Sequence, residues 1–222
     1  MGGSFVFPTL SCPSSPQGGI VLSGFGRYPD GMDELAFPFS NALALVIGPH
    51  AAQAHMLDLA ARLAVGGPLR VFDCGNQFNV YPVARQVRSR TADLSQALGR
   101  IHLARAFTCY QVLALLEEAP DGTTPTLVLD LLSTFYDEDL KLPESQRLLR
   151  LCLEQLDRLS RAAPVIVSVR PPKPIVYAER IVLLEAVCSA ASALWEENTP
   201  MPGVPPAQLP ENQARALPGF DE

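Results

Sequence analysis

Lysine is scarce in this chain: only Lys141 and Lys173 among its 17 basic residues are lysines, and the rest are arginines. Acidic residues number 23, so the formal net charge is -6. A chain with this balance has no general attraction to nucleic acid. Contact with a phosphate backbone would therefore depend on a local group of arginines.

Long apolar runs and paired cysteines are also missing. No run approaches the roughly 20 residues that span a bilayer, and no basic segment precedes an apolar stretch at the N-terminus. The five cysteines are scattered without a C-x-x-C pair, so they lack the spacing typical of a metal site. We therefore expect a cytoplasmic protein with reduced thiols, no resident metal and no membrane contact.

The two ends of the chain differ in composition from its middle. Residues 1–40 are rich in Gly, Pro and Ser, and we expect an irregular arm that packs on its own body or reaches a neighbouring molecule. Within this arm, Ile20-Val21-Leu22 and Leu35-Ala36-Phe37 are apolar enough for short strands or for segments that lie on the body. Residues 198–222 are acidic and proline-rich, which predicts a disordered tail. The regular pattern of residues 41–197 predicts one domain between them.

Strand-like and helix-like segments alternate through that domain. The expected strands are short apolar runs at Leu43–Ile47, Leu69–Cys74, Ile101–Phe107, Thr126–Leu132 and Val165–Val169. The expected helices begin at about Ala52 and continue with Pro82–Ala97, Tyr110–Glu118, Pro143–Ala162 and Tyr177–Glu197. This alternation predicts an α/β fold, a three-layer α/β/α sandwich with a mainly parallel sheet.

The last expected helix depends on an apolar stripe that runs from Tyr177 to Trp195 in steps of three or four residues. Packing against the core explains such a stripe, and so does a groove for a partner.

A phosphate-binding loop of the form G-x-x-x-x-G-K-[ST] would stand between the first strand and the first helix. The eight residues there begin with Gly48, which matches the first glycine. Gln53, Ala54 and His55 stand where the second glycine, the lysine and the hydroxyl residue belong. The position is therefore that of a nucleotide-binding loop, but its phosphate chemistry is absent.

Three stretches carry a resemblance to a known family. They are Val71-Phe72-Asp73-Cys74-Gly75-Asn76-Gln77-Phe78, Arg100-Ile101-His102-Leu103-Ala104-Arg105-Ala106-Phe107-Thr108 and Leu127-Val128-Leu129-Asp130-Leu131-Leu132-Ser133. In order and spacing they resemble the second core strand, the following strand and the Walker B strand of the RecA/RadA recombinase ATPase core, a P-loop NTPase fold. With the loop at Gly48, the resemblance covers about residues 42–170.

The resemblance implies a degenerate nucleotide site. In an active relative the loop lysine neutralises phosphate charge and the hydroxyl holds magnesium. Ala54 does neither, and Gly75 or Asn76 replaces the catalytic carboxylate. Asp130 alone remains, either as a magnesium-associated carboxylate or as a strand-end cap of nearby backbone. We therefore expect no catalytic residue and no firm ATP or magnesium binding, with Gly48, Gln53, Ala54, His55 and Asp130 as vestigial nucleotide-binding positions.

The resemblance also implies that DNA-contacting loops follow the fourth and fifth strands. The first, Phe135–Pro143, is acidic, although Phe135 and Tyr136 offer rings for base stacking. The second carries Arg170 and Lys173. A separate group, Arg85, Arg88 and Arg90, is either a contact face for DNA or a partner, or ordinary solvated helix surface.

We interpret the chain as a non-catalytic accessory or scaffold subunit in DNA repair or recombination, paired with an active RecA-like ATPase or with itself. One alternative is an ATPase with an atypical phosphate loop that uses His55 and Asp130. Another is a general protein-interaction module without a connection to nucleic acid.

Overall fold

A computed structural model describes residues 20–21, 42–137, 139–172 and 178–197 of the chain. In this part, seven strands form one sheet in the order β1-β7-β2-β6-β5-β3-β4, and every neighbouring pair is parallel. The strands are β1 (Ile20–Val21), β2 (Leu43–Ile47), β3 (Leu69–Asp73), β4 (Ile101–Arg105), β5 (Thr126–Leu129), β6 (Val165–Val169) and β7 (Ala193–Glu196).

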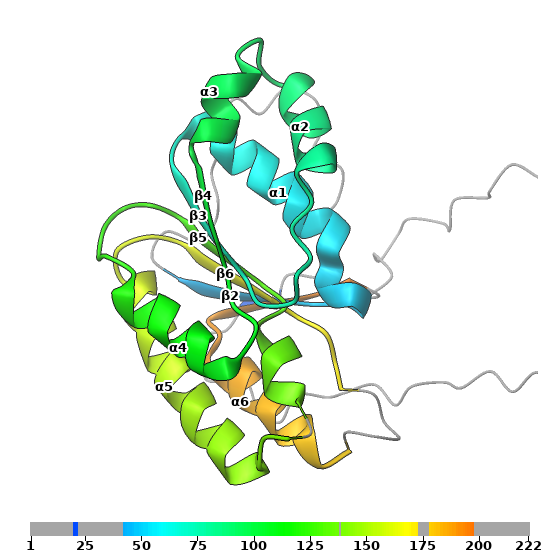
Figure 1. The fold of residues 1–222 in the computed structure, drawn as a ribbon, viewed down its shortest axis with the longest axis vertical. Coiled ribbons are helices and arrows are strands. Elements are labelled where there is room, and N and C mark those ends of the chain that lie inside the picture. The colour runs from blue at the N-terminus through cyan, green and yellow to red at the C-terminus, as the bar shows by residue number, and fades with distance from the viewer. Residues whose placement is uncertain (1–19, 22–41, 138, 173–177, 198–222) are drawn as a thin grey trace, which may run out of the picture.

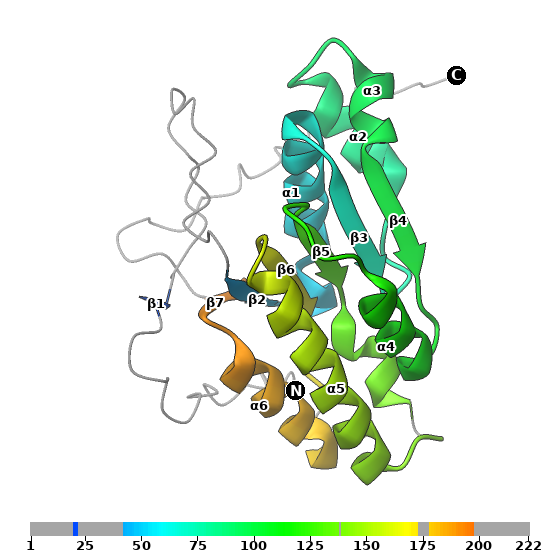
Figure 2. The same cartoon turned by 90° about the vertical axis from the view of Figure 1, so that its left-hand side faces the viewer.

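Helices cover both faces of this sheet (Figures 1 and 2). One layer contains α1 (Gln53–Gly66), α2 (Val80–Arg88) and α3 (Leu94–Gly99), and the other contains α4 (Cys109–Glu118), α5 (Leu142–Ser160) and α6 (Ile181–Ala190). Short 3-10 helices are η1 (Pro49–Ala52), η2 (Leu131–Tyr136) and η3 (Ala178–Arg180). The expected three-layer α/β/α fold with a parallel sheet is confirmed.

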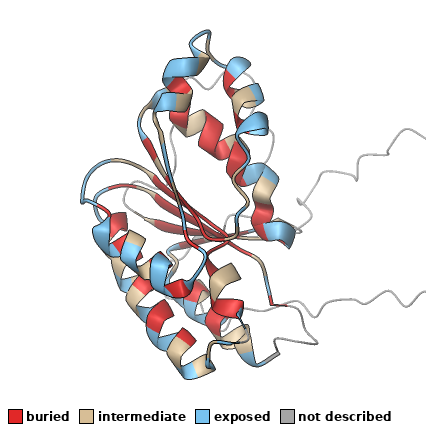
Figure 3. Cartoon of the chain, in the orientation of Figure 1, coloured by how far each residue is buried: buried red, intermediate tan, exposed pale blue. Residues whose placement is uncertain are grey.

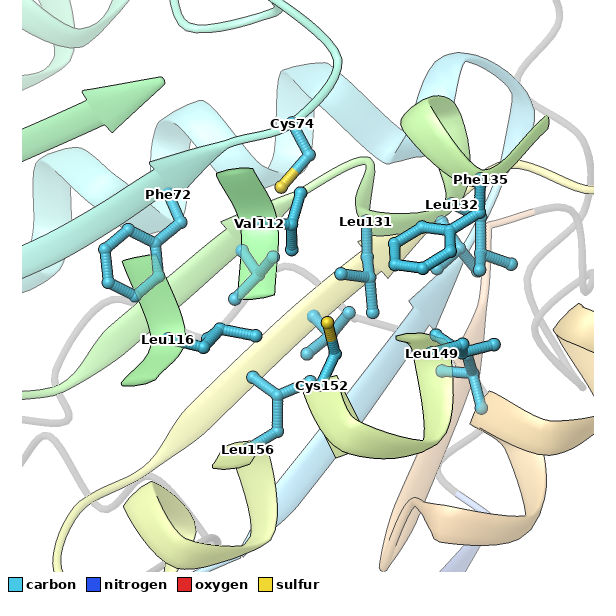
Figure 4. Close-up of a cluster of buried hydrophobic side chains, with 14 of the residues drawn as sticks. Phe72, Cys74, Val112, Leu116, Leu131, Leu132, Phe135, Leu149, Cys152 and Leu156 are labelled. Carbon is cyan, nitrogen blue, oxygen red and sulfur yellow. The ribbon is translucent and has the colours of Figure 1, made fainter. Parts of the chain in front are cut away.

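The central strands are buried on both sides, which explains why they read as continuous apolar runs. In β2, Leu43 and Leu45 belong to the core under α4, α5 and α6, whereas Ala44 and Val46 belong to the core under α1. Figure 3 shows the buried strands between the two helical layers. Figure 4 shows the first core, where Phe72, Leu116, Leu131, Cys152 and Leu156 are drawn.

The prediction of one helix over Tyr177–Glu197 is wrong for the residues that the structure describes. Helix α6 ends at Ala190, and the chain then forms β7 beside β2. The backbone N–H of Ser192 donates to Leu43 O at 2.8 Å, and that of Glu197 donates to Ile47 O at 2.9 Å. Apolar periodicity alone did not distinguish the two forms, because a buried strand is also apolar throughout.

Several predicted boundaries also change. The strand expected to end at Leu132 ends at Leu129, because the backbone of Asp130 turns into the left-handed region with φ 54°. The helix expected over Pro82–Ala97 is two helices, α2 and α3, and the Asp93 side chain caps the second. Strands β3 and β4 end at Asp73 and Arg105.

The two predicted end segments lie almost wholly outside the described residues. Within the N-terminal arm, Ile20–Val21 form one of the two suggested short strands, and its pairing with β7 was not predicted. The other suggested strand, Leu35-Ala36-Phe37, lies outside the described residues. Residues 1–19, 22–41 and 198–222 are outside the described part of the chain.

Candidate functional site

The candidate site lies where four neighbouring strands, β2, β6, β5 and β3, reach their carboxyl ends. Ligands of parallel α/β sheets bind at this edge, because the loops that leave the strands meet there. Gly48 follows β2, Arg170 follows β6, Asp130 follows β5 and Cys74 follows β3. The structure therefore brings the predicted loop, Asp130 and Arg170 to one edge of the sheet.

The loop after β2 is a tight turn whose backbone N–H groups bond to the protein itself. Gly48 N donates to Val169 O at 3.2 Å, and Ala51 N donates to Gly48 O at 3.0 Å. Gln53 N donates to His50 O, and Pro49 has no N–H. Of the amides in this loop, three are thus bonded within the protein and one is missing, which leaves fewer to cradle a phosphate.

Three successive residues of this turn have left-handed backbones, His50 (φ 54°), Ala51 (φ 54°) and Ala52 (φ 50°). Such a conformation costs each non-glycine residue about 1–2 kcal/mol. The side chains of Ala51 and Ala52 are fully buried, so packing around them holds the turn in this form.

The environments of Ala54 and His55 are not those of phosphate-binding residues. Ala54 is exposed on the first turn of α1 and carries no charge. The His55 ring lies edge-on to Trp195, 5.1 Å between centroids, and its Nδ1 is 3.0 Å from Glu197 Oε1. Both partners of His55 lie in or just after β7.

Glu197 covers the loop from that side. A Cβ placed on Gly48 would lie only 2.9 Å from Glu197 Cβ and would also meet its Oε2. The glycine thus allows the acidic side chain to pack on the loop near the start of α1. A carboxylate in this place repels a phosphate group, which carries the same sign of charge.

Asp73, at the end of β3, shapes the next loop. Its side chain is fully buried and accepts the N–H groups of Gln77 at 2.8 Å and Phe78 at 3.0 Å. Arg105 Nε, at the end of β4, is 3.3 Å from Asp73 Oδ2. These bonds fold residues 74–78 back over the strand end, where Gln77 O accepts the side-chain amide of Gln53 at 2.6 Å.

Asp130 is the central charged group of the site. Its side chain is fully buried, and its Oδ2 accepts Gln77 Nε2 at 2.9 Å and forms an ion pair with Arg170. The carboxylate makes no side-chain cap on η2. Burial raises the pKa of Asp130, and the positive charge of Arg170 offsets part of that rise.

Gly75 occupies a position where the resemblance implies a catalytic carboxylate. A Cβ there would lie 2.5 Å from Asp130 Oδ2 and 2.7 Å from Asp130 Cβ. Any side chain at residue 75 would therefore collide with Asp130. The preceding Cys74 is buried, and burial raises the pKa of its thiol well above the ordinary value, so this thiol is a poor nucleophile.

His55 and Asp130, the pair proposed for an atypical ATPase, do not form one group. His55 contacts residues of β7 and its end, whereas Asp130 contacts Gln77 and Arg170. Strand β6 lies between β2 and β5, and this order separates the two positions.

The predicted basic and aromatic contact residues have different environments. Arg85 and Arg88 are exposed on α2, and Arg90 pairs with Asp58 at 2.8 Å. Arg170 is turned inward toward Asp130, and Lys173 lies outside the described residues. The suggestion that Phe135 and Tyr136 stack on bases is wrong: Phe135 is fully buried and Tyr136 is 8% exposed, because η2 turns their rings into the core.

Two clefts flank the site. One of about 670 Å³ is lined by residues of α1, the loop after β3, α2, α3 and β4, including Gln53, Phe78, Leu103 and Arg105. The other, of about 490 Å³, lies over the ends of β3, β5 and β6 and is lined by Gly75, Ser133, Thr134 and Arg170 among others. Of the residues Gly48–His55, Gln53 alone reaches the walls of these two clefts.

Sequence reasoning identified the loop and Asp130 but missed Asp73, Arg105 and Glu197. An acidic residue at a strand end, followed by a turn, is a signal for Asp73, because such carboxylates bond to the backbone that follows them. No comparable signal exists for Arg105 or Glu197, since their roles depend on which strands are neighbours.

The fold defines the class of this protein as a parallel three-layer α/β protein, with a site at the carboxyl ends of its strands. Neither a scan against protein-family models nor a search of curated proteins finds a match to this chain. No described helix is long and apolar enough to cross a membrane. The described residues also contain no group of three or more His, Cys, Asp and Glu side chains suited to a metal ion.

ATP and magnesium do not fit the residues at this site. Three loop amides are bonded internally, a carboxylate lies on the loop, and the buried Asp130 already has an arginine as its counter-ion.

Proposed function

We propose that this chain is a non-catalytic RecA-like subunit, an accessory or scaffold protein of DNA repair or recombination that acts by binding another protein. The RecA-like part of the proposal rests on the three stretches of sequence resemblance and on a parallel α/β fold that is compatible with them. The context of repair and recombination comes from that resemblance.

The observation that carries the proposal is the pairing of Asp130 with Arg170. A carboxylate that serves a nucleotide must be free to hold a metal ion beside the phosphates. Here the carboxylate is buried and bonded to two side chains of its own protein. With Ala54 in place of lysine, no described side chain at the loop neutralises phosphate charge, so catalysis by this chain is not supported.

Exposed apolar side chains support the protein-binding part. The large exposed apolar side chains of the described residues all lie between Val80 and Tyr110: Val80, Tyr81, Leu103, Phe107 and Tyr110. Strand β4 ends the described sheet, pairs with β3 alone and is mostly exposed. An open strand edge beside apolar side chains is a ready docking place for another chain.

Nucleotide binding and hydrolysis by the purified full-length chain test the non-catalytic part. We expect no heat of binding in calorimetry with millimolar ATP and magnesium, and no phosphate release above background. Release of phosphate that is lost in Asp130→Ala would overturn the proposal and favour the atypical ATPase.

Co-expression with a RecA-family ATPase, and sedimentation of the chain alone, test the binding part. We expect Leu103→Glu to abolish co-purification or self-association, because it places a charge at the exposed apolar side chain of β4. Glu154→Lys, on the exposed side of α5, is the control and should leave association intact. Association that survives Leu103→Glu unchanged would remove β4 as the docking place.

A further inference from the structure

The ion pair between Asp130 and Arg170 leads to a second proposal, which rests on the proposed non-catalytic function. We propose that the guanidinium of Arg170 is a built-in cation that replaces a magnesium ion beside Asp130. In this role it fixes the loops after β5 and β6 in one arrangement without a nucleotide.

The first support is the charge balance inside the protein. Asp130 is fully buried, and a buried carboxylate is stable only beside an opposite charge or strong donors. Arg170 supplies the opposite charge, and Gln77 supplies a neutral donor at 2.9 Å. A metal ion would supply the same positive charge in a nucleotide-bound relative.

The second support is the set of atoms that Arg170 contacts. Its Nη2 pairs with the carboxylate of Asp130 and donates to Ser133 Oγ at 3.0 Å. A strand-end carboxylate and a hydroxyl oxygen are the types of protein ligand that hold magnesium in nucleotide hydrolases. The planar guanidinium reaches both oxygens and, unlike magnesium, needs no bound phosphate or water to complete its contacts.

The third support is that Arg170 connects the end of β6 to η2. The Tyr136 hydroxyl donates to Arg170 O at 3.2 Å, so backbone and side chain of Arg170 both bond to η2. Ser133, Thr134, Tyr136, Arg170 and Pro172 line the cleft of about 490 Å³. Arg170 therefore holds two walls of this cleft together through bonds within the protein.

The environment of Asp130 Oδ1 suggests how the replacement of a metal ion by Arg170 can be detected. Asp130 Oδ1 is buried and has no hydrogen-bond partner among the described residues, and the same holds for Thr134 Oγ1. If the arginine is removed, the carboxylate loses its counter-ion and keeps an oxygen with no donor. Divalent cations such as Mn²⁺ prefer carboxylate and hydroxyl oxygens, so one should enter the space that the side chain leaves.

Thermal unfolding of the full chain in a manganese titration tests this inference. We expect Arg170→Ala to unfold several degrees below wild type, and about 10 mM MnCl₂ to raise its midpoint by at least about 2 °C. Manganese should not change the unfolding midpoint of the wild type, because the Arg170 side chain fills the space beside Asp130. Arg170→Ala combined with Asp130→Asn should not respond either, because the carboxylate is gone.

Arg180→Ala is the matched control. Arg180 is also partly buried and bonds to η2 and α5, but the groups that accept its hydrogen bonds are neutral: Phe135 O at 2.5 Å, Leu140 O at 2.6 Å and Ser145 Oγ at 3.1 Å. Its removal should lower the midpoint without creating a response to manganese.

Two results would overturn the inference that Arg170 replaces a magnesium ion beside Asp130. One is an equal response of Arg170→Ala and Arg180→Ala to manganese, and the other is a response that survives Asp130→Asn. If Arg170→Ala does not fold, Arg170→Gln and Arg170→Lys replace it, and only the glutamine variant should respond, because lysine keeps the positive charge. ATP hydrolysis by wild type would overturn the non-catalytic function instead, so the two failures are distinguishable.

Discussion

At the scale of single residues, Gly75 decides whether Asp130 can occupy its place. The backbone of residue 75 is so close to Asp130 that an added Cβ would lie 2.7 Å from its Cβ. A glutamate at this position has no room beside the buried carboxylate. The glycine at residue 75 and the burial of Asp130 are therefore linked by sterics.

We predict that Gly75→Ala destabilises the fold by about 1–3 kcal/mol, because the new methyl group overpacks the site. In a domain of this size, each kcal/mol lowers the melting temperature by about 2–4 °C. Differential scanning calorimetry measures the shift. Gly99→Ala is the control, since a Cβ there meets no atom within 4 Å, and it should be neutral or slightly stabilising. Equal midpoints for both variants would show that the contact at Gly75 relaxes freely.

Asp130 also makes a prediction about pH. Its folded-state pKa is raised by burial, so as pH falls the folded state binds the proton before the unfolded state does. The wild type therefore gains stability from this group as pH falls through the raised pKa toward the ordinary value of 3.8. The variant Asp130→Asn has no carboxyl group at this position, so its stability does not change through this titration.

We expect the stability lost in Asp130→Asn, measured by urea unfolding at several pH values, to grow as pH is lowered from 7 toward that ordinary value. Other groups titrate in both proteins and cancel in the difference. A loss that shrinks over this range would mean that Arg170 outweighs burial and that the pKa of Asp130 is lowered.

At the scale of elements, the sequence correctly predicted those helices and strands whose apolar pattern fits only one kind of secondary structure. Strand β2 was found with its observed bounds because a five-residue apolar run between polar segments suits a strand buried on both faces. Strand β7 was missed because it follows α6 with little change in apolar character. What makes it a strand is the free edge of β2, a neighbour that local pattern does not reveal.

Because local pattern does not reveal which strands are neighbours, only part of the site was predicted from the sequence. Gly48 and Asp130 follow strands at positions fixed by motif and chain order, so sequence alone located them. Whether Asp130 faces a ligand or an arginine depends on β6, which lies between β5 and β2. The end of that strand places Arg170 beside Asp130, and no spacing in the sequence encodes that adjacency.

Trp195 on β7 provides a test of this element. It is 8% exposed and packs in the core under α1 beside the His55 ring. We predict that Trp195→Ala costs about 3–5 kcal/mol in denaturant unfolding, because it leaves a large cavity. Tyr81→Ala removes an aromatic ring that is 82% exposed, and its cost should stay within about 0.5 kcal/mol. A small cost at Trp195 would contradict the placement of β7 in the sheet.

At the scale of the whole molecule, the distribution of charge limits which residues can bind nucleic acid. The net charge is -6, and several arginines are already engaged within the protein: Arg90 pairs with Asp58, Arg105 with Asp73 and Arg170 with Asp130. Arg85 and Arg88 are exposed and form no ion pair within the described residues. They are thus the two cations of the predicted group that remain available to phosphates.

We predict that contact of single-stranded DNA with α2 is weak and involves about two phosphates. The logarithm of the binding constant should then fall with the logarithm of salt concentration with a slope of about -1.4, which is about -0.7 for each phosphate. Fluorescence anisotropy of a labelled oligonucleotide at several salt concentrations measures this slope. Arg85→Gln combined with Arg88→Gln should remove the dependence, whereas Arg62→Gln, on α1, should preserve it. A much steeper slope that survives the double substitution would place the DNA contact elsewhere, and the arginines of α2 would then be solvated helix surface.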